Sequence, residues 1–191
     1  GDTYAKNYEA EISSRGEKLP HYTEVGVGFS KMCLTPMLEY GRQALEDNKK
    51  GVATEALEQV ALAIVVTTAI VSIFLTRDFT PDYNSGLAHA CFYALTAYPV
   101  IEKEHLHGEV VGFGVLYALL VDGQQEEFEK IYALNKELGL PVRIADIGIT
   151  EEQFFETMDR IPQMSDIRHY PYVVTKEMLM QAYETIEQLP V

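Results

Sequence analysis

Two of the chain's five histidines stand where an imidazole could do chemistry. His89 lies within the small, apolar segment GLAHA at 86–90, and His107 opens the apolar segment HGEVVGFG at 107–114. An imidazole surrounded by alanine and glycine is sterically open, and it is too polar to be buried without a partner. If both segments are helical and meet across the connection 98–103, the two rings could converge on one cation. A single histidine on an apolar helix is more often bound by a backbone carbonyl, so the spacing alone leaves both interpretations open.

The other candidate residues carry weaker signals. His105 is two positions from His107 and could be an alternative ligand or a substrate contact, although an exposed loop histidine is favoured. We expect His21 and His169 to be surface residues. Glu109 could accept a proton from a ligand imidazole, or it could cap the start of its helix. No residue is assigned a catalytic role beyond metal binding.

Several familiar sites are absent from the sequence. It contains no GxSxG elbow, no HExxH pair and no phosphate loop ending in Gly-Lys-Ser/Thr. The triplet at 26–28 lacks the third glycine of a dinucleotide fingerprint and has no βαβ context. The triplet at 112–114 lies in an apolar helix, where small residues favour close helix contact. We therefore expect no nucleotide-binding residues and no dinucleotide fold in this chain.

Stop and start signals divide the chain into helical segments. Thr150 with Gln153 forms a capping box, Thr175 caps the last helix, and Gly139 followed by Pro141 is a helix stop. Evidence for strands is thin. The sequence therefore predicts one all-α domain over residues 1–191, a single bundle of about eight helices. The expected helices are 2–14, 29–46, 55–76, 86–97, 107–121, 126–138, 150–160 and 176–188.

The segment 60–75 is strongly apolar and raises the question of a membrane span. It is shorter than the roughly 18–20 residues that cross a bilayer, and it contains Thr67, Thr68 and Ser72. We expect a central helix that is buried on all sides, surrounded by a shell of other helices.

Composition narrows the choice of partners and compartment. With 15 Lys and Arg against 29 Asp and Glu, the formal net charge is −14, which repels nucleic acid and anionic lipid. Cys33 and Cys91 are expected to be buried free thiols, with one long-range disulfide as the alternative. The first residues form no basic and apolar leader. We expect a soluble, cytoplasmic domain that binds neither nucleic acid nor membrane.

The two histidine segments together resemble the glycerol dehydrogenase branch of the iron-containing alcohol dehydrogenase superfamily. In that branch, histidines in an AHA and an HGE segment bind a catalytic zinc, and they correspond to His89 and His107. The third family ligand is an aspartate in a Gly-Asp-Ala-like segment, which the resemblance places at Asp2. The similarity continues through 137–141 and 145–149. It implies the C-terminal helical domain of the superfamily, which dehydroquinate synthases also carry.

The resemblance also implies a reaction. Three ligands leave an open coordination position, as in catalytic zinc sites. A hydroxyl bound there would become more acidic, and its carbon could give hydride to NAD, yielding a ketone or aldehyde. A small polyol or alcohol is the expected substrate, and zinc the expected metal, with iron as the alternative. The resemblance covers only the helical half of the family's architecture, so we expect residues 1–191 to lack the N-terminal NAD-binding domain, and NAD would be reached through a domain in cis or a partner in trans.

Two departures from the family pattern leave alternatives open. Where the family has polar residues after its AHA segment, this chain has Cys91, Phe92 and Tyr93, which puts glycerol itself in doubt as substrate. Lys6 stands where iron-dependent relatives place a fourth ligand, which favours a three-ligand zinc site or repulsion of the cation. The alternatives are a non-catalytic helical interaction module and a dehydroquinate synthase-like lyase. Asp2 counts against the lyase, because lyases have glutamate there. The sequence also leaves open whether the chain forms a homo-oligomer.

Overall fold

The computed structural model describes residues 1–77 and 82–190, and within these ranges the chain is helical with no β-strand. This confirms the predicted all-α fold. The connection between the expected helices 55–76 and 86–97 falls partly outside the described residues. The α-helices are α1 (Asp2–Ser14), α2 (His21–Lys50), α3 (Glu55–Leu62), α4 (Thr68–Leu75), α5 (Leu87–Leu95), α6 (Pro99–Glu104), α7 (His107–Val121), α8 (Gln125–Leu138), α9 (Glu151–Arg160) and α10 (Lys176–Glu187).

Local capping signals gave several helix ends correctly. The Thr150 hydroxyl accepts a hydrogen bond from the Gln153 N–H, and the Gln153 side chain accepts one from the Thr150 N–H, so the capping box is present. The Thr175 hydroxyl accepts a hydrogen bond from the Met178 N–H and so caps α10, without the reciprocal bond of a capping box. Gly139 ends α8 in the left-handed region with a φ of 72°. These signals lie within a few residues of each helix end, which is why the sequence alone reveals them.

Two helix predictions need correction. The expected helix 29–46 extends at both ends, because α2 begins at His21 and includes the 26–28 triplet. Gly26 is needed there, since a Cβ atom would lie 2.7 Å from the Cβ of Phe74 on α4. The expected end of helix 86–97 before Pro99 is confirmed, because α5 ends at Leu95 and Tyr98 is extended, but the connection 98–103 contains an unexpected short helix, α6, whose first residue is Pro99. Proline is favourable at that position because its missing N–H would have no partner in the first turn.

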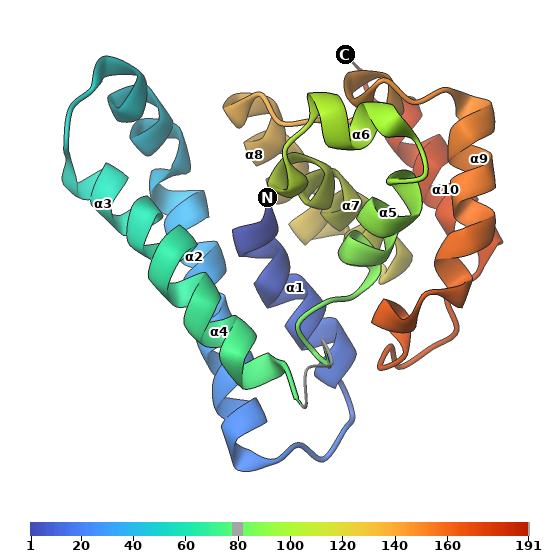
Figure 1. Cartoon of the computed structure of the whole chain (residues 1–191), viewed down its shortest axis with the longest axis horizontal. Coiled ribbons are helices and arrows are strands. Elements are labelled where there is room, and N and C mark those ends of the chain that lie inside the picture. The colour runs from blue at the N-terminus through green and yellow to red at the C-terminus, as the bar shows by residue number, and fades with distance from the viewer. Residues whose placement is uncertain (78–81, 191) are drawn as a thin grey trace.

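The helices form two groups with α1 between them (Figure 1). On one side, α2 lies along the rod formed by α3, a short π-helical stretch (Ala63–Thr67) and α4. On the other side lie α5 to α10, whose main core surrounds α7. α1 packs against both α2 and α7. Cys33 and Cys91 are buried and free, as expected. The first helix is therefore the element that connects the two groups.

The apolar rod Glu55–Leu75 is largely exposed, and the prediction that it is buried on all sides is wrong. It is one continuous helix of 21 residues, long and apolar enough to cross a membrane by length and composition, and only 11% of its most apolar window is buried. Val71 faces the protein, whereas Val65 is 69% and Ile73 is 73% exposed. The reason is that α1 and α2 cover one side of the rod and no described helix covers the other. An apolar face of this kind is typical of an interaction surface.

Charged substitutions on this face are expected to leave stability unchanged. In the variant Val65→Glu with Ile73→Glu, each change should alter the free energy of unfolding by less than about 0.5 kcal/mol, because both side chains are exposed. The control Val71→Glu buries a charge at a site that is 0% exposed and should cost more than about 4 kcal/mol. Urea unfolding measures both. A large loss in the double variant would show that this face is covered in solution.

Candidate metal centre

The three predicted ligands come from three helices and meet at one point. Asp2 is the first residue of α1, His89 lies in the first turn of α5, and His107 is the first residue of α7. One ligand atom from each lies within 4.8 Å of the other two. The Asp2 Oδ1 atom is 3.2 Å from His89 Nε2 and 4.0 Å from His107 Nε2. The structure thus brings together residues that are up to 105 positions apart in the chain.

Glycines allow the helices that carry these ligands to approach closely. A Cβ atom on Gly114 of α7 would lie 2.6 Å from the carbonyl oxygen of Ala88, the residue before His89. A Cβ atom on Gly112 would lie 2.4 Å from the hydroxyl oxygen of Tyr4 on α1. The triplet at 112–114 therefore serves helix packing, as predicted. Because α5 and α1 contact α7 through this small-residue stripe, their ligands reach the start of α7.

The donor set fits a divalent cation. One carboxylate oxygen and two imidazole nitrogens are the ligands that zinc takes in catalytic sites. Asp2 Oδ1 is a buried oxygen that accepts no hydrogen bond, although it lies at ion-pair distance from His89. A buried carboxylate oxygen without a hydrogen bond is costly unless a positive charge compensates it. The cluster therefore provides an oxygen and two nitrogens that lie close enough together to share one cation.

The electrostatics of the cluster favour a positive charge at its centre. Burial opposes protonation of His89, but the nearby Glu9 and Asp2 carboxylates outweigh it and raise the pKa of His89 to about 9. Burial also opposes ionisation of Asp2, yet the contacts with His89 and Lys6 hold the pKa of Asp2 below its usual range. Burial and the charge of His89 lower the pKa of His107. The site thus stabilises one added positive charge between Asp2 and His89.

Glu9 is a site residue that sequence reasoning missed. Its side chain is fully buried, and its Oε2 atom lies 2.6 Å from Nδ1 of His89. The available signal was spacing: Glu9 follows Asp2 by seven positions, which places both carboxylates on one face of a helix, two turns apart. The sequence could not show that His89 would lie beside that face.

Lys6 and the aromatic residues of α5 border the same cluster. The Lys6 side chain is buried, and its Nζ atom lies 3.4 Å from Asp2 Oδ1 and donates a hydrogen bond to the Asn84 carbonyl oxygen. The Phe92 ring meets the His107 ring edge-on, with centroids 4.4 Å apart. The ligand cluster is therefore bordered by the ammonium group of Lys6 and by the apolar ring of Phe92.

The remaining candidates lie elsewhere. His21 is exposed, as expected. His169 is not a free surface residue: its Nδ1 is 2.8 Å from Glu17 and its Nε2 is 2.8 Å from Asp82. This pairing joins loops that are distant in sequence, so no local pattern revealed it.

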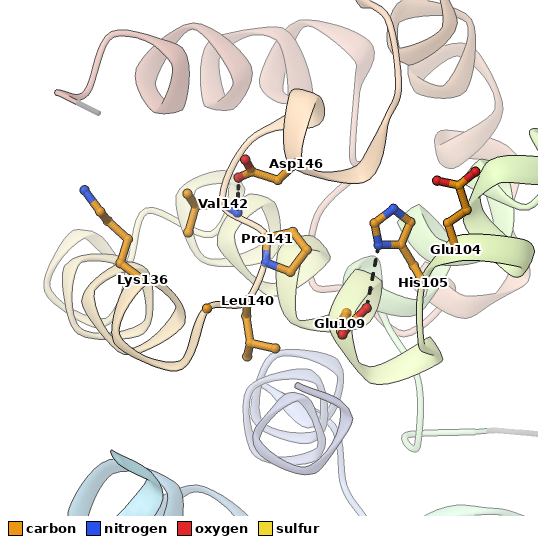
Figure 2. Close-up of a pocket in the computed structure, with 9 residues that line it drawn as sticks. Glu104, His105, Glu109, Lys136, Leu140, Pro141, Val142 and Asp146 are labelled. Atoms are coloured by element: carbon orange, nitrogen blue, oxygen red, sulfur yellow. Dashed lines mark hydrogen bonds and ion pairs between the residues drawn. The ribbon is translucent and has the colours of Figure 1, made fainter. Parts of the chain in front are cut away.

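His105 and Glu109 line a pocket that is separate from the ligand cluster. This pocket of about 510 Å³ lies beside the start of α7, and Figure 2 shows the side chains of His105 and Glu109 facing each other in it. The Nδ1 atom of His105 lies 3.6 Å from Oε2 of Glu109. Glu109 accepts a hydrogen bond from the Leu106 N–H, which is the capping role. None of the three ligands lines this pocket. We therefore place the candidate chemistry at the ligand cluster rather than in this pocket.

Comparison with known proteins identifies the relatives of the chain. No family model matches it. The glycerol dehydrogenase of Thermotoga maritima is 28% identical over 203 residues, covering 98% of this chain and 52% of that protein. The chain is therefore similar in sequence to glycerol dehydrogenases over nearly its whole length. Hydroxycarboxylate dehydrogenase A of Escherichia coli is 27% identical over 98% of the chain and 52% of its own length. The resemblance predicted from the histidine segments is thereby confirmed.

The fold comparison agrees with this relationship. A probable glycerol dehydrogenase from Sinorhizobium meliloti superposes with a TM-score of 0.76 over 97% of this chain and 52% of that chain, at 21% identity. The predicted helical fold of the dehydrogenases is therefore present. The chain spans about half the length of the glycerol dehydrogenase homologues it matches.

Proposed function

We propose that this chain is the metal-binding, substrate-side part of an NAD-dependent, zinc-type dehydrogenase that acts on a small polyol or alcohol. The observation that carries the proposal is the convergence of Asp2, His89 and His107 within 4.8 Å in a homologue of the glycerol dehydrogenases. Zinc is favoured over iron because Lys6 stands one turn after Asp2, where a fourth ligand would be needed, and a protonated lysine cannot bind a metal.

Each residue has a distinct part in this proposal. Asp2, His89 and His107 would hold the cation and leave a coordination position open. The cation would supply Lewis acidity, which makes the hydroxyl of a bound alcohol a better acid. His107 is the most exposed of the three ligands, with 44% of its side chain accessible, so the substrate would approach from its side. Phe92 against His107 favours a substrate with an apolar portion over glycerol.

Oxidation of an alcohol also needs a hydride acceptor. The described residues are helical and form no βαβ unit, so this chain would bind NAD only together with a nucleotide-binding domain. That domain could be attached in cis or supplied by a partner in trans, and a homo-oligomer would be compatible with either arrangement. The chain matches only about half the length of these two relatives, which supports a separate nucleotide-binding part.

Zinc binding tests the proposal directly. We expect purified protein to bind one zinc ion per chain, and the variant His89→Ala with His107→Ala to bind none, because two of three ligands are removed. Isothermal titration of metal-free protein with zinc chloride, together with elemental analysis, measures this. Unchanged zinc content in the double variant would contradict the proposal.

The ion pair between Lys6 and Asp2 favours one alternative, a non-catalytic helical module in which lysine takes the place of the metal. If the chain is a dehydrogenase part, Lys6→Met should tighten zinc binding by about tenfold, because a positive charge near the ion is removed. In the non-catalytic alternative, zinc binds only after Lys6→Met. The control Lys31→Met removes an exposed charge on α2 and should leave the Kd for zinc unchanged. No observation favours the lyase.

A further inference from the structure

Glu9 is the most completely buried carboxylate beside the ligand cluster. Its side chain is 0% exposed, in the middle of α1. Both of its oxygens are used: Oε1 accepts hydrogen bonds from the N–H groups of Gly86 and His89, at 2.8 and 3.0 Å. Oε2 lies 2.6 Å from the Nδ1 atom of the His89 ring. A charged group that is this deeply buried is stable only when its acceptor capacity is satisfied, and here it is.

The two oxygens act on the same histidine in two ways. Gly86, the residue before α5, provides no side-chain cap, so Oε1 of Glu9 satisfies N–H groups at the start of that helix. This contact fixes the backbone of His89, while Oε2 fixes the rotation of its ring. Because one carboxylate holds both, the ring of His89 has little freedom relative to α1, which also carries Asp2.

The contact with Oε2 sets which nitrogen faces the cluster. An ionised carboxylate can only accept a hydrogen bond, so Nδ1 of His89 must be the donor. An imidazole that binds a cation is neutral, so Nε2 of His89 would then carry the lone pair, and this atom lies 3.2 Å from Asp2 Oδ1. Two acceptors at that distance repel each other unless a positive charge lies between them. Glu9 thus creates the arrangement that a cation would stabilise.

The absence of a side chain at Gly86 leaves space for the buried Glu9 carboxylate. A Cβ atom at Gly86 would lie 3.2 Å from Cγ of Glu9 and 3.1 Å from the Tyr170 ring, so a side chain at position 86 would crowd the carboxylate. The Tyr170 hydroxyl accepts a hydrogen bond from the Leu87 N–H, the third donor at the start of α5. The lack of a side chain at Gly86 leaves room for the Glu9 carboxylate. The Tyr170 hydroxyl accepts from the Leu87 N–H, to which Glu9 makes no hydrogen bond.

We propose that Glu9 is a positioning residue for the metal centre: its carboxylate fixes His89 so that Nε2, and not Nδ1, is presented to a cation held with Asp2 and His107. This inference rests on the proposed function, because it concerns the same site. Glu9 acts through its contacts with His89 and is not itself one of the three proposed ligands. Partners of this kind orient imidazole ligands and strengthen them as donors.

The substitution Glu9→Gln tests the role with almost no change in volume. The glutamine Oε1 can still accept from both N–H groups of α5, so the helix cap should persist. Its NH₂ group would face Nδ1 of His89 and donate to it, which forces the ring proton onto Nε2. We expect the Kd for zinc to rise about 10- to 100-fold, as for loss of other partners that orient a ligand. The unfolding temperature without metal should change far less than in Glu9→Leu, which also removes the cap.

A matched control is Asp166→Asn, which neutralises another buried carboxylate near α5 whose partner is the Ser85 hydroxyl. Its Kd for zinc should stay within twofold of the parent protein. The ¹⁵N shifts of His89 at zinc saturation provide a second readout, because they identify the coordinating nitrogen. In the parent protein we expect zinc on Nε2 and a proton on Nδ1.

The outcomes separate this inference from the function it rests on. Weakened zinc binding in Glu9→Gln, with the control unchanged and Nε2 coordination in the parent, supports the positioning role. If the parent binds zinc and Glu9→Gln binds it equally well, the role of Glu9 is wrong and the proposed function stands. If the parent binds no zinc, the proposed function fails and the inference fails with it.

Discussion

Gly114→Ala is expected to separate the two helices that carry the histidine ligands. The new Cβ atom would lie 2.6 Å from the carbonyl oxygen and 2.9 Å from the Cα atom of Ala88. Both are backbone atoms of α5, so no side chain can rotate away and the helix itself must move. We expect a loss of about 3 kcal/mol or more in the free energy of unfolding, at the upper end of the cost of overpacking. The zinc affinity should fall as well, because His89 and His107 move apart.

The matched control is Gly28→Ala, which adds the same methyl group to a helix. Position 28 lies in α2, and nothing lies within 4 Å of the added Cβ atom. Because alanine restricts the unfolded chain and favours helix, stability should rise by about 0.5–1 kcal/mol. Urea unfolding and zinc titration of both variants measure the contrast. Equal stability of the two variants would show that α5 and α7 do not approach each other this closely.

The single variants His89→Ala and His107→Ala should lose zinc alike but differ in stability. Each removes a direct ligand, so the Kd for zinc should rise by more than the roughly 100-fold limit typical of an orienting partner. His89→Ala also leaves the Oε2 atom of buried Glu9 without its ring donor, which should cost about 1–3 kcal/mol or more. His107 is 44% exposed, so His107→Ala should change the free energy of unfolding by about 0.5 kcal/mol or less.

Urea unfolding in the presence of a chelator isolates the stability effect, and zinc titration measures the binding effect. The contrast depends on the position of the two side chains rather than on their chemistry, which is the same. Retention of zinc by His107→Ala would remove that residue from the ligand set. Equal loss of stability in both variants would contradict the contact between His89 and Glu9.

The sequence by itself determined most helix ends and the ligand candidates. Thr150, Thr175 and Gly139 act through hydrogen bonds or backbone angles within a few residues, so their effect is present in the local sequence. The histidine segments and the Gly-Asp segment were also recognisable, because the match to the glycerol dehydrogenases depends on short runs of residues. At Pro99 the local signal was incomplete: the preceding helix ends before it as predicted, but proline is also favourable in the first turn of a helix, and α6 was not predicted.

Only the tertiary structure decided which residues meet and which surfaces are covered. That Asp2, His89 and His107 share one point depends on how closely α1, α5 and α7 pack, which Gly112 and Gly114 permit. The partnership of Glu9 with His89 joins residues 80 positions apart. The apolar rod Glu55–Leu75 looked like a core helix, yet burial is set by neighbours, and α1 and α2 cover only one side of it. Hydrophobic pattern reports which side chains favour burial, and only the packing of distant elements determines whether they are buried.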